Sequence, residues 1–236
     1  MKENEIRKLE SEIHHEFQLE RVILFSDAVF AIAITLMVIE LKFPEIGKKV
    51  SADEFWDSFR PLFRNFFAFM VSFFFIGMYW YRHLKLCGLL VDYNRTFITL
   101  NLLFLFFIVL FPFSVSTMTH LSNDFFIFPM LIYFGNIFFA MVTHFILYMY
   151  LLRTGSTISK PISPREKQIL REASFIPIIL ISLIGTAFIL TRTIFKDHQE
   201  YSLLILFPTV LFVFFIRRRM NNRHRQIKEE IIHNQK

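Results

Sequence analysis

An acidic residue, Asp27, lies near the start of a long apolar stretch that spans residues 21–44. Between Asp27 and Glu40 this stretch holds no charged residue and no helix breaker. A helix of this length crosses a hydrocarbon layer of about 30 Å. An ionisable side chain that faces lipid costs about 3 kcal/mol. We therefore expect the Asp27 carboxylate to point into protein or water and to have a partner, and we treat it as a candidate functional residue.

The candidate partners of Asp27 are polar residues expected at the same depth. Asp27 lies about 9 Å above Arg21 along one helix. Trp80 and His83 close the second apolar run, and Asn101 lies one or two turns into the third. These depths predict one polar layer that supplies hydrogen-bond donors and acceptors to all of its members. The same residue types also fit an interfacial belt of Arg, His and Trp with one additional Asn.

An aliphatic stripe follows Asp27 on the same predicted helix. Ile32, Leu36 and Ile39 recur at helical spacing and so share one face, with Thr35 beside them. Asp27 lies five residues before Ile32, which is about 140° around the helix. The acid and the stripe therefore face different directions. The stripe alone fits either ordinary helix packing or the lining of an axial site, which would need several subunits because the pattern occurs once in the chain.

The sequence carries no pattern typical of an enzyme. Its histidines lack the spacing of a zinc site, and no glycine-rich phosphate loop is present. Ser26 and Asp27 are chain neighbours, and adjacent helical residues diverge by about 100°, a poor geometry for a nucleophile and its base. The glycines do not form a T-V-G-Y-G carbonyl filter. We expect no catalytic residue, no metal site and no cofactor.

The composition indicates which elements position these residues. Of the 236 residues 54% are hydrophobic, 33 are Phe and only 6 are Gly, which predicts an all-α membrane protein. A capping-box pattern at residues 51–54 predicts a short helix before the second span. Six apolar runs predict six membrane-spanning helices, at residues 21–44, 62–81, 97–118, 126–151, 175–190 and 201–216.

Three regions follow from these runs. Residues 1–20 place Ile6, Leu9, Ile13 and Phe17 at helical spacing between charges, which indicates a cytosolic amphipathic segment or a solvated extension of the first span. Residues 21–217 form the predicted membrane domain, and residues 218–236 form a basic tail. The single cysteine, Cys87, allows no internal disulfide.

The placement of the positive charges predicts the orientation. Nineteen of the 26 Lys and Arg residues lie at the termini or in the second and fourth connections between the predicted spans. By the positive-inside rule both termini are then cytosolic. The net charge of +6 alone would also suit nucleic-acid binding, but the basic residues that follow the last span are typical of a headgroup anchor.

The motif around Asp27 resembles the signature of a known family. The run R-x-x-x-F-S-D at Arg21, Phe25, Ser26 and Asp27, followed by A-V-F-A-I-A-I-T-L, is similar to the signature of the Transmembrane Protein 175 family of lysosomal and prokaryotic potassium channels. The resemblance extends to W-x-x-H, which ends at His83. It also covers the N-L to F-P-F stretch at residues 101–113, and so spans roughly the first half of the chain.

The resemblance implies a function and a set of roles. Prokaryotic members of the family are six-helix subunits that assemble as homotetramers, with a pore lined by the first helix. By position, Ile32, Leu36 and Ile39 would form a hydrophobic constriction, and Thr35 would contribute to selectivity. The residues that would brace the pore helix from behind are Arg21, Phe25, Ser26, Asp27, Trp80, His83 and Asn101.

The expected function is therefore a homotetrameric channel in the plasma membrane, of bacterial type, that passes K⁺ modestly in preference to Na⁺. Its partners would be the lipid bilayer and the permeant cations, with no nucleic acid. A second interpretation is a proton-conducting or proton-coupled transporter that uses Asp27 and His83 as relay groups, although transporters commonly carry internal repeats that this sequence lacks. A third is an integral-membrane enzyme or a non-conducting scaffold, which the lack of clustered catalytic residues disfavours.

Overall fold

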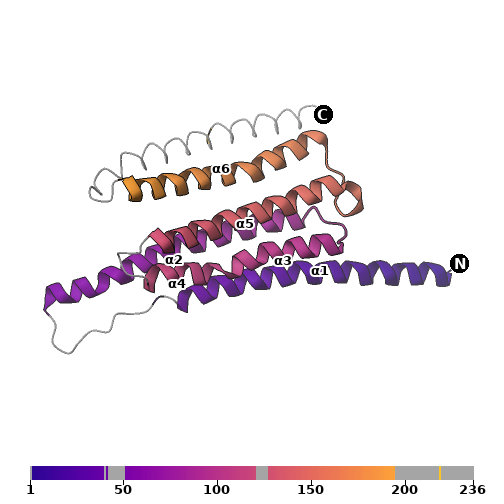
Figure 1. The fold of residues 1–236 in the computed structure, drawn as a ribbon. Helices are drawn as coiled ribbons and strands as arrows, with labels where there is room; N and C mark the ends of the chain where they lie inside the picture. Colours follow the sequence, from indigo (N-terminus) through magenta and orange to yellow (C-terminus); the bar gives the residue numbers. More distant parts are fainter. Residues whose placement is uncertain (1, 40, 42–50, 121–126, 195–217, 219–236) are drawn as a thin grey trace. The chain divides into compact units, whose positions relative to one another are not determined.

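The structure is a computed structural model and describes the chain apart from residues 1, 40, 42–50, 121–126, 195–217 and 219–236 (Figure 1). The chain divides into two compact units, Met1–Ile162 and Ser163–Lys236. The elements of the first unit are α1 (Lys2–Ile39), α2 (Ala52–Cys87), α3 (Arg95–Val109), α4 (Phe111–His120), α5 (Ile127–Thr154) and the 3₁₀ turn η2 (Gly155–Thr157). The second unit contributes α6 (Pro164–Ile194).

The described residues are helical apart from loops and one isolated bridge between Leu90 and Ser159. Four helical stretches are long and apolar enough to cross a membrane, within α1, α3 with α4, α5 and α6. This confirms an all-helical fold with several candidate spans for the described part of the chain. The second predicted span lies within α2, which is not among those four, and the sixth lies outside the described residues. Six spans and two cytosolic termini therefore stay predictions.

α1 is one uninterrupted helix of 38 residues. The amphipathic segment predicted at residues 1–20 is continuous with the first span, as in the alternative of a helical extension. Its apolar residues Ile6, Ile13 and Phe17 are exposed. α2 is also continuous, over 36 residues, and passes through Pro61. The separate short helix predicted before the second span is therefore wrong, because loss of one backbone donor at a proline does not by itself end a helix.

The third predicted span consists of two helices placed end to end. α3 ends at Val109, the N–H of the capping residue Leu110 bonds back to the Phe106 carbonyl, and α4 begins at Phe111. Pro112 has no N–H and its ring crowds the carbonyl four residues earlier, which explains a break at this point. The N-terminus of α3 is capped by Asn94, whose side-chain oxygen accepts from the Phe97 N–H at 2.9 Å.

The core of the first unit lies where α1, α2, α3, α4 and α5 pack side by side (Figure 1). Phe30, Phe104 and Phe111 are fully buried there. Tyr79 of α2 packs edge-on against Phe104 and Phe111, and its hydroxyl donates to the Ile137 carbonyl at 2.9 Å. Because apolar burial gives little preference for protein over lipid tails, such close packing and interhelical hydrogen bonds hold a membrane bundle together.

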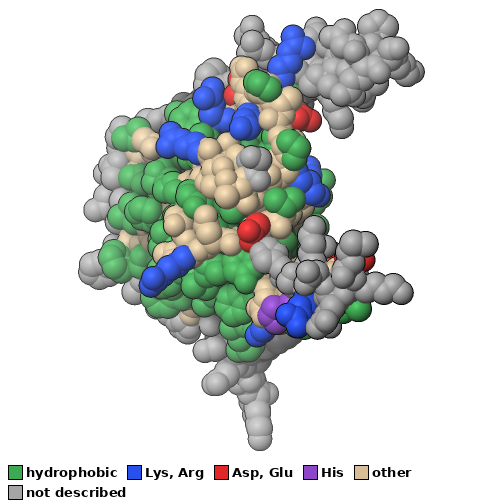
Figure 2. All heavy atoms as spheres, turned by 90° about the vertical axis from the view of Figure 1, so that its right-hand side faces the viewer, with side chains coloured by type: hydrophobic (Ala, Val, Ile, Leu, Met, Phe, Trp, Pro, Cys, Tyr) green, Lys and Arg blue, Asp and Glu red, His purple; other side chains and the backbone are tan. Residues whose placement is uncertain are grey.

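Two connections are joined at one end of the first unit. The chain between α2 and α3 bonds to the chain after η2, with Val91 donating to the Ile158 carbonyl at 3.0 Å and Lys160 donating to the Leu89 carbonyl at 2.8 Å. The Lys160 ammonium also donates to the Gly88 carbonyl at 2.9 Å. Figure 2 shows Lys and Arg side chains among hydrophobic ones on the face toward which these connections lie.

Candidate functional site

α1 has two unlike faces in its apolar half. Ser26, Phe30, Ala33 and Met37 recur at helical spacing and are at most 2% exposed. This face packs against α2, α3 and α4. The other face carries the aliphatic stripe predicted from the sequence.

The stripe is uncovered in the single chain. Ile32 is 56% exposed, Leu36 42% and Ile39 68%. Thr35 is exposed beside them, and its hydroxyl donates to the carbonyls of Ala31 at 3.0 Å and Ile32 at 2.9 Å. The Thr35 hydroxyl proton is therefore occupied by the helix backbone, which leaves the oxygen as an acceptor on the exposed face.

Asp27 has a partner on α2. The Trp80 indole Nε1–H donates to the Asp27 Oδ1 at 2.9 Å, which joins the first two helices. Asp27 is partly buried, whereas Trp80 is 40% exposed. A hydrogen bond from a neutral indole stabilises the carboxylate without neutralising its charge.

A second polar pair joins α1 to α3. The Asn101 amide Nδ2 donates to the Ser26 Oγ at 2.9 Å, and Ser26 in turn donates to the Val22 carbonyl at 3.1 Å. Both side chains are at most 2% exposed. Within the described part of the chain the Asn101 Oδ1 has no hydrogen-bond partner.

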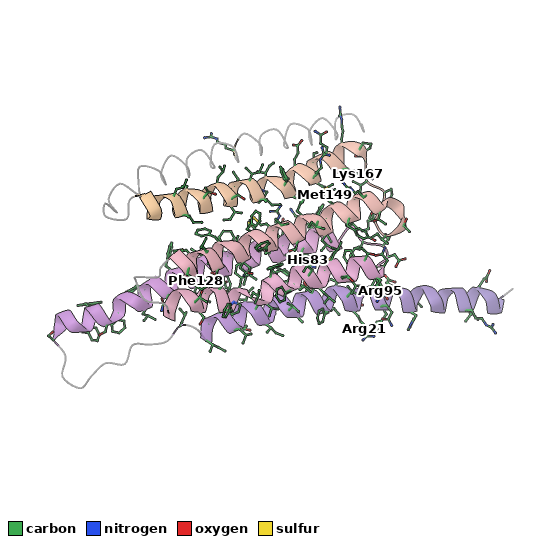
Figure 3. All side chains as sticks on the ribbon, in the orientation of Figure 1. Arg21, His83, Arg95, Phe128, Met149 and Lys167 are labelled. Carbon is green, nitrogen blue, oxygen red and sulfur yellow. The ribbon has the colours of Figure 1, made fainter. Side chains whose placement is uncertain are left out.

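His83 lies in the centre of the first unit (Figure 3). It is 1% exposed, and its ring centroid is 5.8 Å from that of Phe30 and 5.4 Å from that of Phe104. Neither ring nitrogen has a hydrogen-bond partner among the residues that the structure describes. His83 is thus buried behind α1 among aromatic rings.

Two members of the predicted layer lie elsewhere. Arg21 and Phe25 are exposed on α1, and Figure 3 shows the Arg21 side chain directed away from the bundle. The structure thus brings Ser26, Asp27, Trp80, His83 and Asn101 to the interfaces of α1, α2 and α3. The bracing role of all seven residues, including Arg21 and Phe25, stays a prediction.

Cys87 is the last residue of α2 and is 7% exposed. Burial raises the pKa of the Cys87 thiol to about 12, and the negative charge of Asp27 adds to this rise. The thiol therefore stays protonated and poorly reactive at neutral pH.

A set of buried polar residues on α5 was not predicted from the sequence. The hydroxyls of Tyr133 and Ser72 are 2.9 Å apart, and the Asn136 amide donates to the Ser114 Oγ at 3.4 Å. His144 lies further along α5 and is 3% exposed. Tyr133, Asn136 and His144 share a spacing, three and then eight residues, that puts them on one side of a helix. Polar residues at that spacing in an apolar run were the available signal.

The fold and this site define an all-helical protein with candidate membrane spans, whose first helix is hydrogen-bonded to its neighbours on one face and bare on the other. Comparison with known proteins gives a family match over part of the chain. Residues 21–112 match the family described as the endosomal/lysosomal potassium channel TMEM175. The resemblance of the R-x-x-x-F-S-D motif to the Transmembrane Protein 175 family is therefore confirmed, and residues 21–112 carry it.

Curated relatives are similar over part of their length. The chain is 36% identical to a potassium channel of Chryseobacterium sp. (strain P1-3) over 96 residues, which cover 41% of this chain and 46% of that protein. It is 35% identical to a potassium channel of Chamaesiphon minutus over 41% of this chain and 47% of the relative. The chain thus matches about half the length of these relatives.

Two solved structures share the fold. The crystal structure of a lysosomal potassium-selective channel TMEM175 homolog from Chamaesiphon minutus superposes with a TM-score of 0.64 at 21% identity, over 86% of this chain and 98% of that one. A variant of the potassium channel MtTMEM175, in complex with a nanobody–MBP fusion protein, gives a TM-score of 0.50 at 19% identity, over 89% of this chain and 93% of that one.

Proposed function

We propose that this chain is the subunit of a homotetrameric cation channel that passes K⁺ in preference to Na⁺. The observation that carries the proposal is the bare stripe of Ile32, Leu36 and Ile39 on a helix whose opposite face is fully buried. Four copies of such a helix around an axis would cover the stripe and line a pore with it. The relatives are named as potassium channels and not as enzymes, which supports the same proposal.

The stripe would act as a hydrophobic constriction. Rings of aliphatic side chains oppose ions because they displace water and offer no ligand in exchange for lost hydration. Conduction then requires widening or hydration of the ring. Ile32, Leu36 and Ile39 lie at successive depths on α1, so they would form successive rings along the axis.

Thr35 is the proposed source of selectivity. Its hydroxyl proton is engaged by the backbone carbonyls of α1, so its oxygen is the group that would meet a cation. K⁺ loses its hydration shell at lower cost than Na⁺, and a weak oxygen ligand next to an apolar ring would therefore favour K⁺ modestly. The only small-molecule partners in this proposal are the permeant ions.

The polar contacts behind α1 would hold the stripe toward the axis. Trp80 bonds Asp27 and Asn101 bonds Ser26 at two adjacent positions of α1, from two different helices. Two such bonds restrict rotation of α1 about its own axis more than either would alone. We propose six spans, cytosolic termini and a plasma-membrane location for the assembled protein.

The second interpretation, a proton pathway through Asp27 and His83, has less support. The described hydrogen bond of Asp27 is to Trp80, whose indole cannot accept a proton from a neighbour and pass it on. His83 is enclosed by Phe30 and Phe104. These contacts do not form a direct proton relay between Asp27 and His83.

The test is recording from purified protein in planar bilayers under opposed K⁺ and Na⁺ gradients. A reversal potential that follows the K⁺ gradient supports the channel. One that follows an imposed pH gradient supports the proton pathway, and the absence of current would contradict both. Light scattering on the same preparation measures whether the conducting species is a tetramer.

A further inference from the structure

Five buried polar atoms of the first unit have no hydrogen-bond partner among the described residues. They are His83 Nδ1, His83 Nε2, His144 Nε2, Asn101 Oδ1 and Asn136 Oδ1. All four side chains are at most 7% exposed. A buried polar atom without a partner costs about 1–3 kcal/mol, and ordered water is a common partner of such atoms where no protein group bonds them.

His83 and His144 are close neighbours from α2 and α5. Their ring centroids are 6.1 Å apart with the planes inclined by 61°. Both rings pack against Phe104 of α3, at 5.4 Å for His83 and 4.9 Å for His144. The imidazoles make no direct hydrogen bond, and their centres are near enough for one water to bond to a nitrogen of each ring.

Asn101 belongs to the same region of the bundle. It precedes Phe104 by three residues on the buried face of α3, about one helical turn away. Its amide nitrogen is used by Ser26 of α1, while its oxygen is left as an acceptor. The group that completes this site must therefore donate a hydrogen bond to Asn101.

We propose that ordered water binds between His83, His144 and Asn101 and joins α5 to the helices behind α1. A neutral imidazole donates from one nitrogen and accepts at the other, and water does both. Water in this position therefore bonds to one nitrogen of each ring and donates to the Asn101 oxygen. Through Asn101 and Ser26 this water connects His144 to the rear face of α1, which makes His144 a positioning residue.

The chemistry of the site favours water over an ion. The site offers imidazole nitrogens and an amide oxygen next to the aromatic ring of Phe104. Among the described residues no group of three or more His, Cys, Asp or Glu side chains could hold a metal. A bare cation would lose its hydration without a carboxylate to balance its charge, whereas buried water needs only two to four polar partners.

The experiment is water-edited solid-state NMR on the full chain in lipid bilayers, with histidine labelled by ¹⁵N and the isoleucine δ1 methyl groups by ¹³C. Magnetisation is transferred from water protons to each imidazole. His83→Phe and His144→Phe assign the two signals. His14, which is exposed, is the positive control, and the methyl group of the fully buried Ile137 on α5 is the dry control.

The expected result is transfer to both His83 and His144 several-fold faster than to the Ile137 methyl group. Transfer to both no faster than to Ile137, or to only one of the two, would overturn the bridging water. If the Phe variants do not fold, a density map of the unmodified protein at a resolution that shows water decides the matter. A peak within hydrogen-bond distance of both rings supports the proposal, and a map without one rejects it.

Discussion

Asn101 of α3 donates a buried hydrogen bond of 2.9 Å to Ser26 of α1, while Ile32, six residues further along α1, is 56% exposed. The same helix is thus fixed to the bundle by a polar contact on one face and carries an uncovered apolar stripe on another. This relationship gives the proposed pore its orientation and allows the two faces to be tested by separate substitutions.

Truncation of the stripe should increase conduction. Ile32→Ala removes a branched side chain from the proposed ring, and a wider ring is more readily hydrated. We expect a several-fold rise in single-channel conductance, measured in planar bilayers. Leu103→Ala is the matched control, because Leu103 is a similarly exposed aliphatic residue, at 45%, on α3. Equal conductance of the Ile32 variant and the unmodified protein would contradict a constriction at Ile32.

Loss of the Asn101 hydrogen bond should lower the stability of the bundle. Asn101→Leu keeps a similar volume and removes both the bond to Ser26 and the polar atom without a described partner. We expect the free energy of unfolding to fall by about 1–2 kcal/mol, measured by denaturation in detergent. Thr99→Val on the exposed side of α3 is the control and should change it by about 0.5 kcal/mol or less. Equal effects of the two substitutions would show that the bond adds nothing.

Asp27 should matter for assembly more than for selectivity. Asp27→Asn keeps an oxygen that can accept from the Trp80 indole, whereas Asp27→Leu removes the acceptor. We therefore expect a reduced tetramer fraction or fewer open channels in Asp27→Asn and a greater loss in Asp27→Leu, by light scattering and bilayer recording. The K⁺ to Na⁺ permeability ratio should change little. A normally assembled Asp27→Asn tetramer with altered permeability ratio would place Asp27 in the ion path instead.

Thiol labelling tests the burial of Cys87 on α2 and, through an introduced cysteine, the exposure of the stripe on α1. Because the pKa of Cys87 is raised to about 12, its thiolate fraction remains small from about pH 7 to pH 9. Maleimide labelling of the folded protein should be slow across that range and rapid after denaturation. Thr35→Cys in this background should label rapidly in detergent-dispersed single subunits and more slowly once the subunits assemble. Fast labelling of Cys87 in the folded protein would contradict its burial.

The sequence predicted directions around a helix better than contacts between helices. The separation of Asp27 from Ile32 follows from helical geometry alone, and the structure places these residues on different sides of α1. The pairing of Asn101 with Ser26 could not be predicted in the same way, because it depends on how α1 and α3 cross and on their relative depth. Arg21 is directed outward, and an argument from depth along the helix does not determine that direction.

The fold shows the same distinction. Apolar runs predicted the bodies of α1, α5 and α6, because a long hydrophobic stretch has few other structures available in lipid. They did not predict the break between α3 and α4, which lies next to Pro112. They also did not predict that α2 continues through Pro61. In the sequence His144 is one of several scattered histidines, since its relation to His83 exists only once α2 and α5 pack around Phe104.

α1 extends without a break over 38 residues, about 57 Å, nearly twice the thickness of a hydrocarbon layer. Its first half would therefore project from the membrane as a stiff lever attached to Ile32 and Leu36. Any protein or lipid surface that tilts or twists this lever would turn the stripe against the contacts of Ser26 and Asp27. Mechanical work done outside the bilayer would in this way reach the narrowest part of the proposed pore.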